Sequence, residues 1–317
     1  MENSIDISTL EARLISELLI DYPDLLVRFP IWKYLNYLDC YPEIGDYLYL
    51  SRDVSNYCKA IVEYSDERTL EIYQKLVLVT LISRARRQLA SKVSPGEIKE
   101  LYESNFRRII REIETNMNPS GFYRYPEDKF FKELGVCNLR MIPTGARKIH
   151  LGGLARRFLF KKGPKQFFQG IIFIVFELKG TKPLYEMHTD SHDPDLMADF
   201  NYEGFTRAYM RIAQLLKLNE NVRGVFASSW FYDPQLAVIS PRLAYLREII
   251  TNNGGRCFYW GASGQATKDA ILKSPTRSQL YKEGRYRPIK YMVVWSREKM
   301  LRWADKHLCD TGSSESD

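Results

Sequence analysis

The stretch that decides the fold lies between Leu184 and Trp230 and contains, in order, "LYEMHTD", "YEGFTRAYMRIAQLLKLN" and "VRGVFASSW". The first piece alternates apolar and polar residues and leads into a polar loop, which is typical of a strand that ends at a loop. The second piece (residues 202–219) repeats its apolar residues at helical spacing, and the third (residues 222–230) again favours a strand. These residues therefore predict a strand–helix–strand unit.

The regions on either side extend this unit into a sheet covered by helices. Upstream, "FFQGIIFIVFELKG" (residues 167–180) favours a neighbouring strand, and downstream, helices and strands alternate through "IKYMVVWS" (residues 289–296) to a final helix. Such an order is typical of α/β and α+β proteins. We expect a mixed central sheet flanked by helices.

The N-terminal part has only helical patterns. The strongest helix start lies at "SPGEIKEL", where Ser94 is the expected N-cap, Pro95 suits the first helical position and Glu97 completes the cap. The Pro/Gly/Tyr-rich stretch "NPSGFYRYPEDK" (residues 118–129) resembles a linker. We predict a helical region over residues 1–120, an α/β domain over 121–308 and a disordered polar tail over 309–317, since 317 residues suit two domains.

Charge is distributed unevenly along the chain. Residues 1–60 contain ten Asp or Glu and five Lys or Arg, whereas the whole chain has a net charge of +7. Residues 140–167 contain eight Lys or Arg and no acid. Such a basic patch favours anionic partners, which here include a phosphorylated cofactor, an acidic carrier protein and nucleic acid, although a basic surface also serves solubility alone.

The cysteine content and the apolar runs predict a cytoplasmic protein without a membrane span. Five cysteines are widely spaced and form no CxxC motif, which is typical of reduced thiols. The longest apolar runs fall far short of the ~20 residues that a spanning helix needs. The opening "MENSIDISTLEARL" has neither the basic nor the apolar region of a secretory leader.

The end of the first strand is a candidate site for acid–base chemistry. Glu186 and His188 are two residues apart on a strand and so project from one face, which Asp190 continues into the loop. A carboxylate beside an imidazole can deprotonate an amine or a hydroxyl group. The alternative is a polar loop whose aspartates cap the next helix.

A metal site at this strand end is the second interpretation. His188-x-Asp190 matches the start of the 2-His-1-carboxylate site of a non-haem iron oxygenase, which needs a distant second histidine. His150 and His307 remain as candidates, because His192 lies in a segment that does not favour a helix. We predict acid–base chemistry and no metal ligand here.

The strand expected over residues 222–230 leads into "SSWF" (residues 228–231), which suggests the wall of a pocket. Ser228, Ser229 and Trp230 follow one another before a loop, but no GxSxG motif supports a serine nucleophile. Packing in the core is an equally ordinary role for Trp230.

The strand–helix–strand unit, together with "RSQLYKEGRYRPIKYMVVW" (residues 277–295), resembles the GNAT-type N-acyltransferase superfamily over residues ~171–300. The late stretch is similar to that family's A-x-x-L-Y-x-x-x-G-F motif, whereas its glycine-rich motif before the central helix is replaced by "DLMADFNYEG". The resemblance implies that an acyl-CoA or acyl-carrier-protein thioester lies between two splayed central strands and donates its acyl group to an amine. The pyrophosphate of the donor would meet the N-terminus of the following helix.

The resemblance also implies roles for individual residues. Glu186 or His188 would be the base, and Tyr281 would protonate the leaving thiolate. From the residue patterns themselves, the expected substrate-binding residues are Asp190, Asn201, Ser228, Ser229 and Trp230, and the expected anion-binding residues are Arg147, Arg156 and Arg157.

A non-catalytic protein that binds nucleic acid or another anionic partner remains an alternative. The basic stretch interleaves Phe158 and Phe160 with its cations, which suits contacts with phosphates and stacking on bases. No RNP, KH or helix-turn-helix motif accompanies it.

Overall fold

The computed structural model describes residues 6–48, 51–91, 93–116, 121, 123–190, 193–272 and 274–312. Its contacts divide the chain into two compact units, with the boundary along the sequence between Pro143 and Thr144. The boundary that the sequence suggests at residue 120 precedes one further helix, α7 (Asp128–Cys137), of the first unit. Residues 313–317 of the expected tail lie outside the described residues, and 309–312 belong to α15 (Arg297–Gly312).

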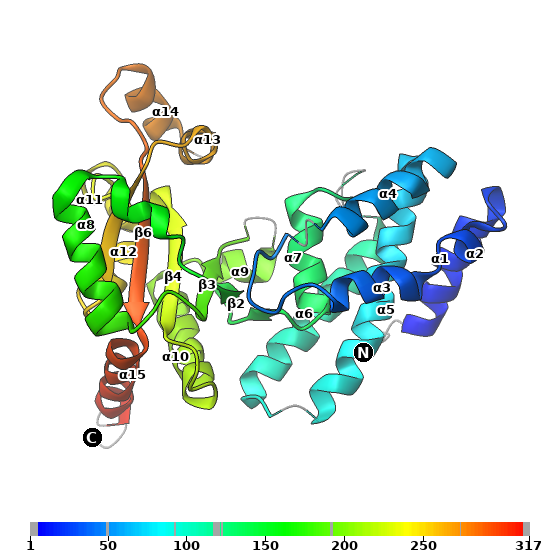
Figure 1. Cartoon of the computed structure of the whole chain (residues 1–317), viewed down its shortest axis with the longest axis horizontal. Helices are drawn as coiled ribbons and strands as arrows, with labels where there is room; N and C mark the ends of the chain where they lie inside the picture. Colours follow the sequence, from blue (N-terminus) through cyan, green and yellow to red (C-terminus); the bar gives the residue numbers. More distant parts are fainter. Residues whose placement is uncertain are drawn as a thin grey trace. The chain divides into compact units, whose positions relative to one another are not determined.

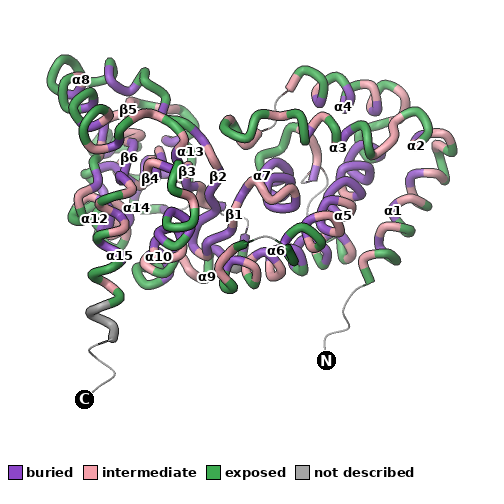
Figure 2. The backbone as a smooth tube through the Cα atoms, turned by 60° about the horizontal axis from the view of Figure 1, so that its bottom comes forward, coloured by how far each residue is buried: buried purple, intermediate pink, exposed green. Residues whose placement is uncertain are grey.

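The first unit is helical, as predicted. Helix α5 (Glu67–Ser91) is buried along most of its length and packs against several other helices of this unit (Figure 2). The apolar run "LVLVTLI" therefore forms the centre of this unit. No described helix has the combination of length and apolarity that crossing a membrane requires. The other elements are α1 (Ile7–Asp21), α2 (Leu25–Arg28), α3 (Ile31–Asp39), α4 (Arg52–Tyr64), α6 (Gly96–Thr115) and β1 (Met141–Pro143).

The second unit contains strands in the order β2-β3-β4-β6-β5 (Figure 1). Pair β3–β4 is parallel, whereas β2–β3, β4–β6 and β5–β6 are antiparallel, so the predicted mixed sheet is confirmed. The strands are β2 (Lys148–Gly152), β3 (Leu184–His188), β4 (Gly224–Ser229), β5 (Arg256–Gly261) and β6 (Lys290–Ser296). The helical elements are η1 (Arg156–Phe160), α8 (Gly163–Ile172), η2 (Phe173–Leu178), α9 (Pro194–Ala198), α10 (Tyr202–Leu218), η3 (Trp230–Tyr232), α11 (Leu236–Ile239), η4 (Pro241–Leu243), α12 (Tyr245–Thr251), α13 (Gly264–Leu272), α14 (Pro275–Lys282) and α15.

Helices cover both faces of this sheet. On one face, Phe158 of η1 and Phe173 of η2 pack against Phe226 and Phe258 of the strands. Alternation along β6 turns Trp295 to the opposite face. There it contacts Tyr209 of α10, with ring centroids 5.8 Å apart, and Trp303 of α15, with ring centroids 5.1 Å apart. Helices therefore pack against both faces of the sheet that contains the strand–helix–strand unit.

The strand predicted over residues 167–180 is wrong, because this segment is helical. Helix α8 begins at Gly163, contains Pro164 in its first turn and continues as the π-helix η2. Residues of this helix that face the sheet are Gln166, Gly170, Phe173 and Leu178, a spacing of three to five. Apolar residues also lie on the outer side of this helix. Because both sides are apolar, the sequence does not show the alternation of apolar and polar residues from which a helical period is recognised.

Gly170 lets α8 approach η1 closely. A methyl group at this position would lie 2.3 Å from Leu159 Cδ2 and 3.2 Å from Phe158 Cε2, and both side chains are buried. We expect Gly170→Ala to lower the free energy of unfolding by about 1–2 kcal/mol, because crowding of the core outweighs the helix propensity of alanine. Denaturant unfolding would measure the change. Gly96→Ala is the control, since nothing lies within 4 Å of its added methyl group, and equal stability of both variants would contradict the expectation.

Candidate functional site

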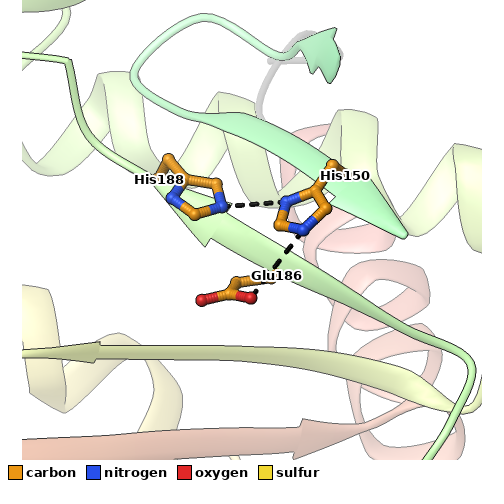
Figure 3. Close-up of side chains that lie close together, drawn as sticks. All are labelled: His150, Glu186 and His188. Atoms are coloured by element: carbon orange, nitrogen blue, oxygen red, sulfur yellow. Dashed lines mark hydrogen bonds and ion pairs between the residues drawn. The ribbon is translucent and has the colours of Figure 1, made fainter. Parts of the chain in front are cut away.

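Strands β2 and β3 bring three titratable side chains together. His150 of β2 lies directly opposite Glu186 of β3 in the antiparallel register, and Lys148 lies opposite His188. Opposed residues share a face of the sheet, and so do residues two apart on one strand. Figure 3 shows the resulting cluster, in which the two imidazole rings lie side by side and the Glu186 carboxylate points towards His150.

His150 contacts both other members of this cluster. His188 Nε2 and His150 Nδ1 are 2.9 Å apart, and His150 Nε2 lies 3.8 Å from Glu186 Oε2. The first is a hydrogen bond, whereas the second is long enough that Glu186 acts mainly through its charge. His150 is 5% exposed and the Glu186 side chain 31% exposed, so the cluster extends from the interior towards solvent.

The contacts favour one arrangement of protons. A hydrogen bond between two imidazoles needs one N–H donor and one nitrogen lone pair. We assign the N–H of His150 to Nε2, which faces the Glu186 carboxylate, so its Nδ1 accepts the proton of His188 Nε2. The lone pair of His188 is then on Nδ1. In this tautomer His188 can accept a proton, and His150 transmits the stabilising effect of Glu186.

Pairing between β3 and β4 ends beside the cluster. The parallel register contains Tyr185 opposite Val225 and Glu186 opposite Phe226. Beyond Glu186, His188 still pairs with β2, and Ser229 of β4 still pairs with β6. Within the described register, the far ends of β3 and β4 are thus each paired with an outer neighbour and not with each other. Their carboxyl ends are the edge at which open α/β sheets bind ligands.

A group of cations lies on the same face as Glu186. The Arg157 guanidinium lies 5.0 Å from the ring centre of Trp260, and Lys290 Nζ lies 5.7 Å from it. Burial lowers the pKa of Lys290, while the charge of Glu186 opposes that change and Arg157 adds to it. Lys290 and Arg157 therefore act electrostatically in the surroundings of Glu186 and could bind an anionic group there.

Asp190 has a different environment from the one expected of a substrate ligand. Its carboxylate is fully buried, 3.2 Å from Lys148 Nζ, and Asp193 lies 2.9 Å from the same ammonium group. Asp193 also accepts the N–H of Leu196 and so caps α9. This buried ion group connects Lys148 of β2 with Asp190 and Asp193, and it suits Asp190 to positioning rather than to contact with a substrate.

Other residues expected in the site are engaged in the fold. Ser229 Oγ accepts the N–H of Phe231, and Trp230 is buried beneath the Arg277 guanidinium, which lies 4.8 Å from its ring. Asn201 accepts the N–H of Gly204, so the N-terminus of α10 carries its own cap where the resemblance implies a pyrophosphate. Ser228 follows Phe226 on β4 by two residues and thus shares the face of the cluster.

The two remaining groups of predicted residues differ in exposure. Arg147 is buried and donates to Tyr232 Oη (2.8 Å) and to Thr189 Oγ1, so it holds the core rather than an external anion. Arg156 and Arg157 are exposed on η1. Tyr281 is 41% exposed on α14, which lies with α13 beyond the end of the sheet where β4 ends (Figure 1).

His150 is the functional candidate that the sequence did not assign to the acid–base site. It stands in "KIHLG" of the basic stretch, and only the register of β2 on β3 places it opposite Glu186. Together with Glu186 and His188 it forms a described group whose ligand atoms lie within 4.8 Å of one another. Two imidazoles and a carboxylate suit zinc or iron, so the absence of a metal remains a prediction to be tested.

The chain has distant likenesses among solved structures. No protein-family model and no curated protein matches the sequence. An acyltransferase in complex with decanoyl-CoA is 15% identical and has a TM-score of 0.46, with 90% of this chain and 86% of that chain covered. A mutant acyltransferase in complex with octanoyl-CoA is 11% identical and has a TM-score of 0.48, with 90% and 83% covered. These values are too low to identify a shared activity.

Proposed function

We propose that this protein transfers an acyl group from a CoA or carrier-protein thioester to an amine. The observation that carries the proposal is the short β3–β4 ladder, which ends at Glu186 while both strands continue. A thioester donor placed between the carboxyl ends of β3 and β4 would lie beside His188. The succession of β3, α10 and β4 supports the proposal, because the GNAT-type resemblance of the sequence is based on this strand–helix–strand unit.

In the proposed reaction, His188 accepts the amine proton as the nitrogen attacks the thioester carbonyl carbon. The C–S bond breaks, and the leaving thiolate takes a proton, for which Tyr281 on α14 is the proposed donor. The imidazolium of His188 is stabilised through His150 by the charge of Glu186. Ser228 is a proposed substrate contact, whereas Asp190 contacts Lys148 and Asn201 caps α10.

The side chain of Asn201 caps the N-terminus of α10, so this helix end is not the proposed site for the phosphates of the donor. The phosphates need cationic side chains instead. We propose Arg156, Arg157 and Lys290 for this role and leave out Arg147, which is buried. An anionic acceptor would meet the same charges, so KM values measured separately for donor and acceptor would distinguish the two uses.

The test is amine-dependent release of free thiol from medium-chain acyl-CoA, followed with a thiol reagent and with mass spectrometry of the amine product. We expect release to require a primary amine. Thiol release without any amine would indicate a thioesterase and would contradict the proposal, as would failure of isothermal titration to detect binding of either acyl-CoA or an acyl carrier protein. Salt-sensitive binding to generic DNA or RNA in place of thioesters would favour the non-catalytic alternative.

A further inference from the structure

Helix α8 and its continuation η2 leave a row of large apolar side chains in solvent. The row comprises Phe168, Ile171, Ile172, Val175 and Phe176, spaced three and four residues apart on one side of the helix. Phe168 is 62% exposed and Phe176 73% exposed, and Phe160 at the end of η1 is 74% exposed. We call these six residues the α8 apolar face; the exposed stretches of α8 are green in Figure 2.

The orientation of this face is fixed by the other side of the helix. Phe173 and Leu178 are buried against the sheet, and Gly170 packs against Phe158 and Leu159. Gln166 donates to the carbonyl groups of Phe158 (2.7 Å) and Tyr259 (2.9 Å). The helix therefore cannot turn its outer side chains inwards without breaking these contacts. A contiguous exposed apolar surface of this kind marks an interaction site.

Exposed cations stand at the N-terminal end of the face. Residues 156–165 contain five Lys or Arg and no acid, and all five are exposed. Among the described residues, none of these cations has an ion pair with an acid. The single acid between residues 156 and 179 is Glu177, which already pairs with Arg256 (2.9 Å) and with Lys299.

This combination suits an anionic lipid surface better than a second copy of the chain. A second copy would bring the same cations and no unpaired acid from this face. A bilayer supplies both partners, because its acyl region accepts the phenylalanines and its anionic headgroups attract the lysines. We propose that α8 and η2 dock the protein onto anionic membrane surfaces by their apolar face, with Lys161, Lys162 and Lys165 contacting the headgroups, whether or not the protein transfers an acyl group.

Vesicle sedimentation with the full chain tests this proposal. We expect binding to vesicles of phosphatidylcholine with phosphatidylglycerol and much weaker binding to phosphatidylcholine alone. Phe168→Ser combined with Phe176→Ser should weaken binding by more than about tenfold. Replacing Lys161, Lys162 and Lys165 by Gln should weaken it by about a hundredfold, since each cation near an anionic surface contributes about a factor of five.

Matched controls distinguish binding through this face from nonspecific hydrophobic adsorption and from an effect of total charge. The first control combines Val238→Ser with Leu272→Ser and so removes two exposed apolar side chains outside the α8 apolar face. The second control replaces Lys268, Lys282 and Lys306 by Gln and so removes as much charge as the triple lysine variant of the face. Both controls should bind like the unaltered chain, and circular dichroism should show all variants folded. Equal losses in test and control variants would overturn the proposal. So would a dimer in lipid-free sedimentation that Phe168→Ser dissociates, because the face would then join two copies.

Discussion

His188→Gln is expected to lower kcat/KM for acyl transfer by roughly 10²- to 10⁴-fold, the usual contribution of a positioned acid–base group. Gln keeps a hydrogen-bond donor that can reach His150 Nδ1 but has no nitrogen that takes up a proton at neutral pH. KM for the thioester should change little, because the substitution leaves the cations Arg157 and Lys290 in place. Steady-state kinetics with varied donor and acceptor would measure both values.

The control for this substitution is His307→Gln, which alters a histidine whose ring lies against Trp303 on α15. It should leave kcat/KM unchanged. His150→Asn should lower kcat with little change in KM, since His150 acts through His188 and does not itself take the amine proton. A rise in KM alone for either cluster variant would indicate a role in binding rather than in proton transfer.

Metal analysis of the same variants distinguishes the two interpretations of the cluster. Three ligands are sufficient for a catalytic metal, and His150, Glu186 and His188 could supply them. We expect neither zinc nor iron in stoichiometric amount in the purified protein. A stoichiometric metal that disappears in His188→Gln would replace the acid–base interpretation by a metal site.

The second large effect is expected for Lys148→Met, which should lower the free energy of unfolding by about 3–5 kcal/mol. The substitution removes the ammonium group that two buried carboxylates, Asp190 and Asp193, both contact. Uncompensated buried charge is far more costly than the loss of an exposed ion pair. Denaturant unfolding monitored by tryptophan fluorescence would give the difference.

An exposed ion pair of the same unit provides the comparison. Lys217 lies 2.8 Å from Asp305, and both side chains are at least half exposed, so Lys217→Met should cost less than about 1 kcal/mol. Adding Asp190→Asn and Asp193→Asn to Lys148→Met should recover part of the stability, because the buried charges are then removed together. Similar losses in the two lysine variants would show that Lys148 is not buried in solution.

Several elements could be predicted because their signals are local. The helix start near residues 94–97, the helical period of residues 202–219 and the alternation in "LYEMHTD" depend on residues within one or two turns, and the structure contains a helix or strand at each place. The expected Ser94 cap is wrong, because α6 begins at Gly96 after Pro95 and has no side-chain cap. The helix of residues 163–178 was not predictable in the same way. Its two faces are both apolar, so the sequence pattern could not show which period it follows.

The sequence by itself determined the mixed α/β class, the helical N-terminal part and the shared face of Glu186 and His188, because each follows from the period of one segment. Only the tertiary structure placed His150 beside them, since the register of β2 on β3 depends on side-chain packing across the sheet and not on either strand alone. The same packing buried Asp190 and Arg147, whose charges alone suggested exposed ligands. It also turned Phe168 and Phe176 outwards, because the sheet can bury one side of a helix and leaves the other to solvent.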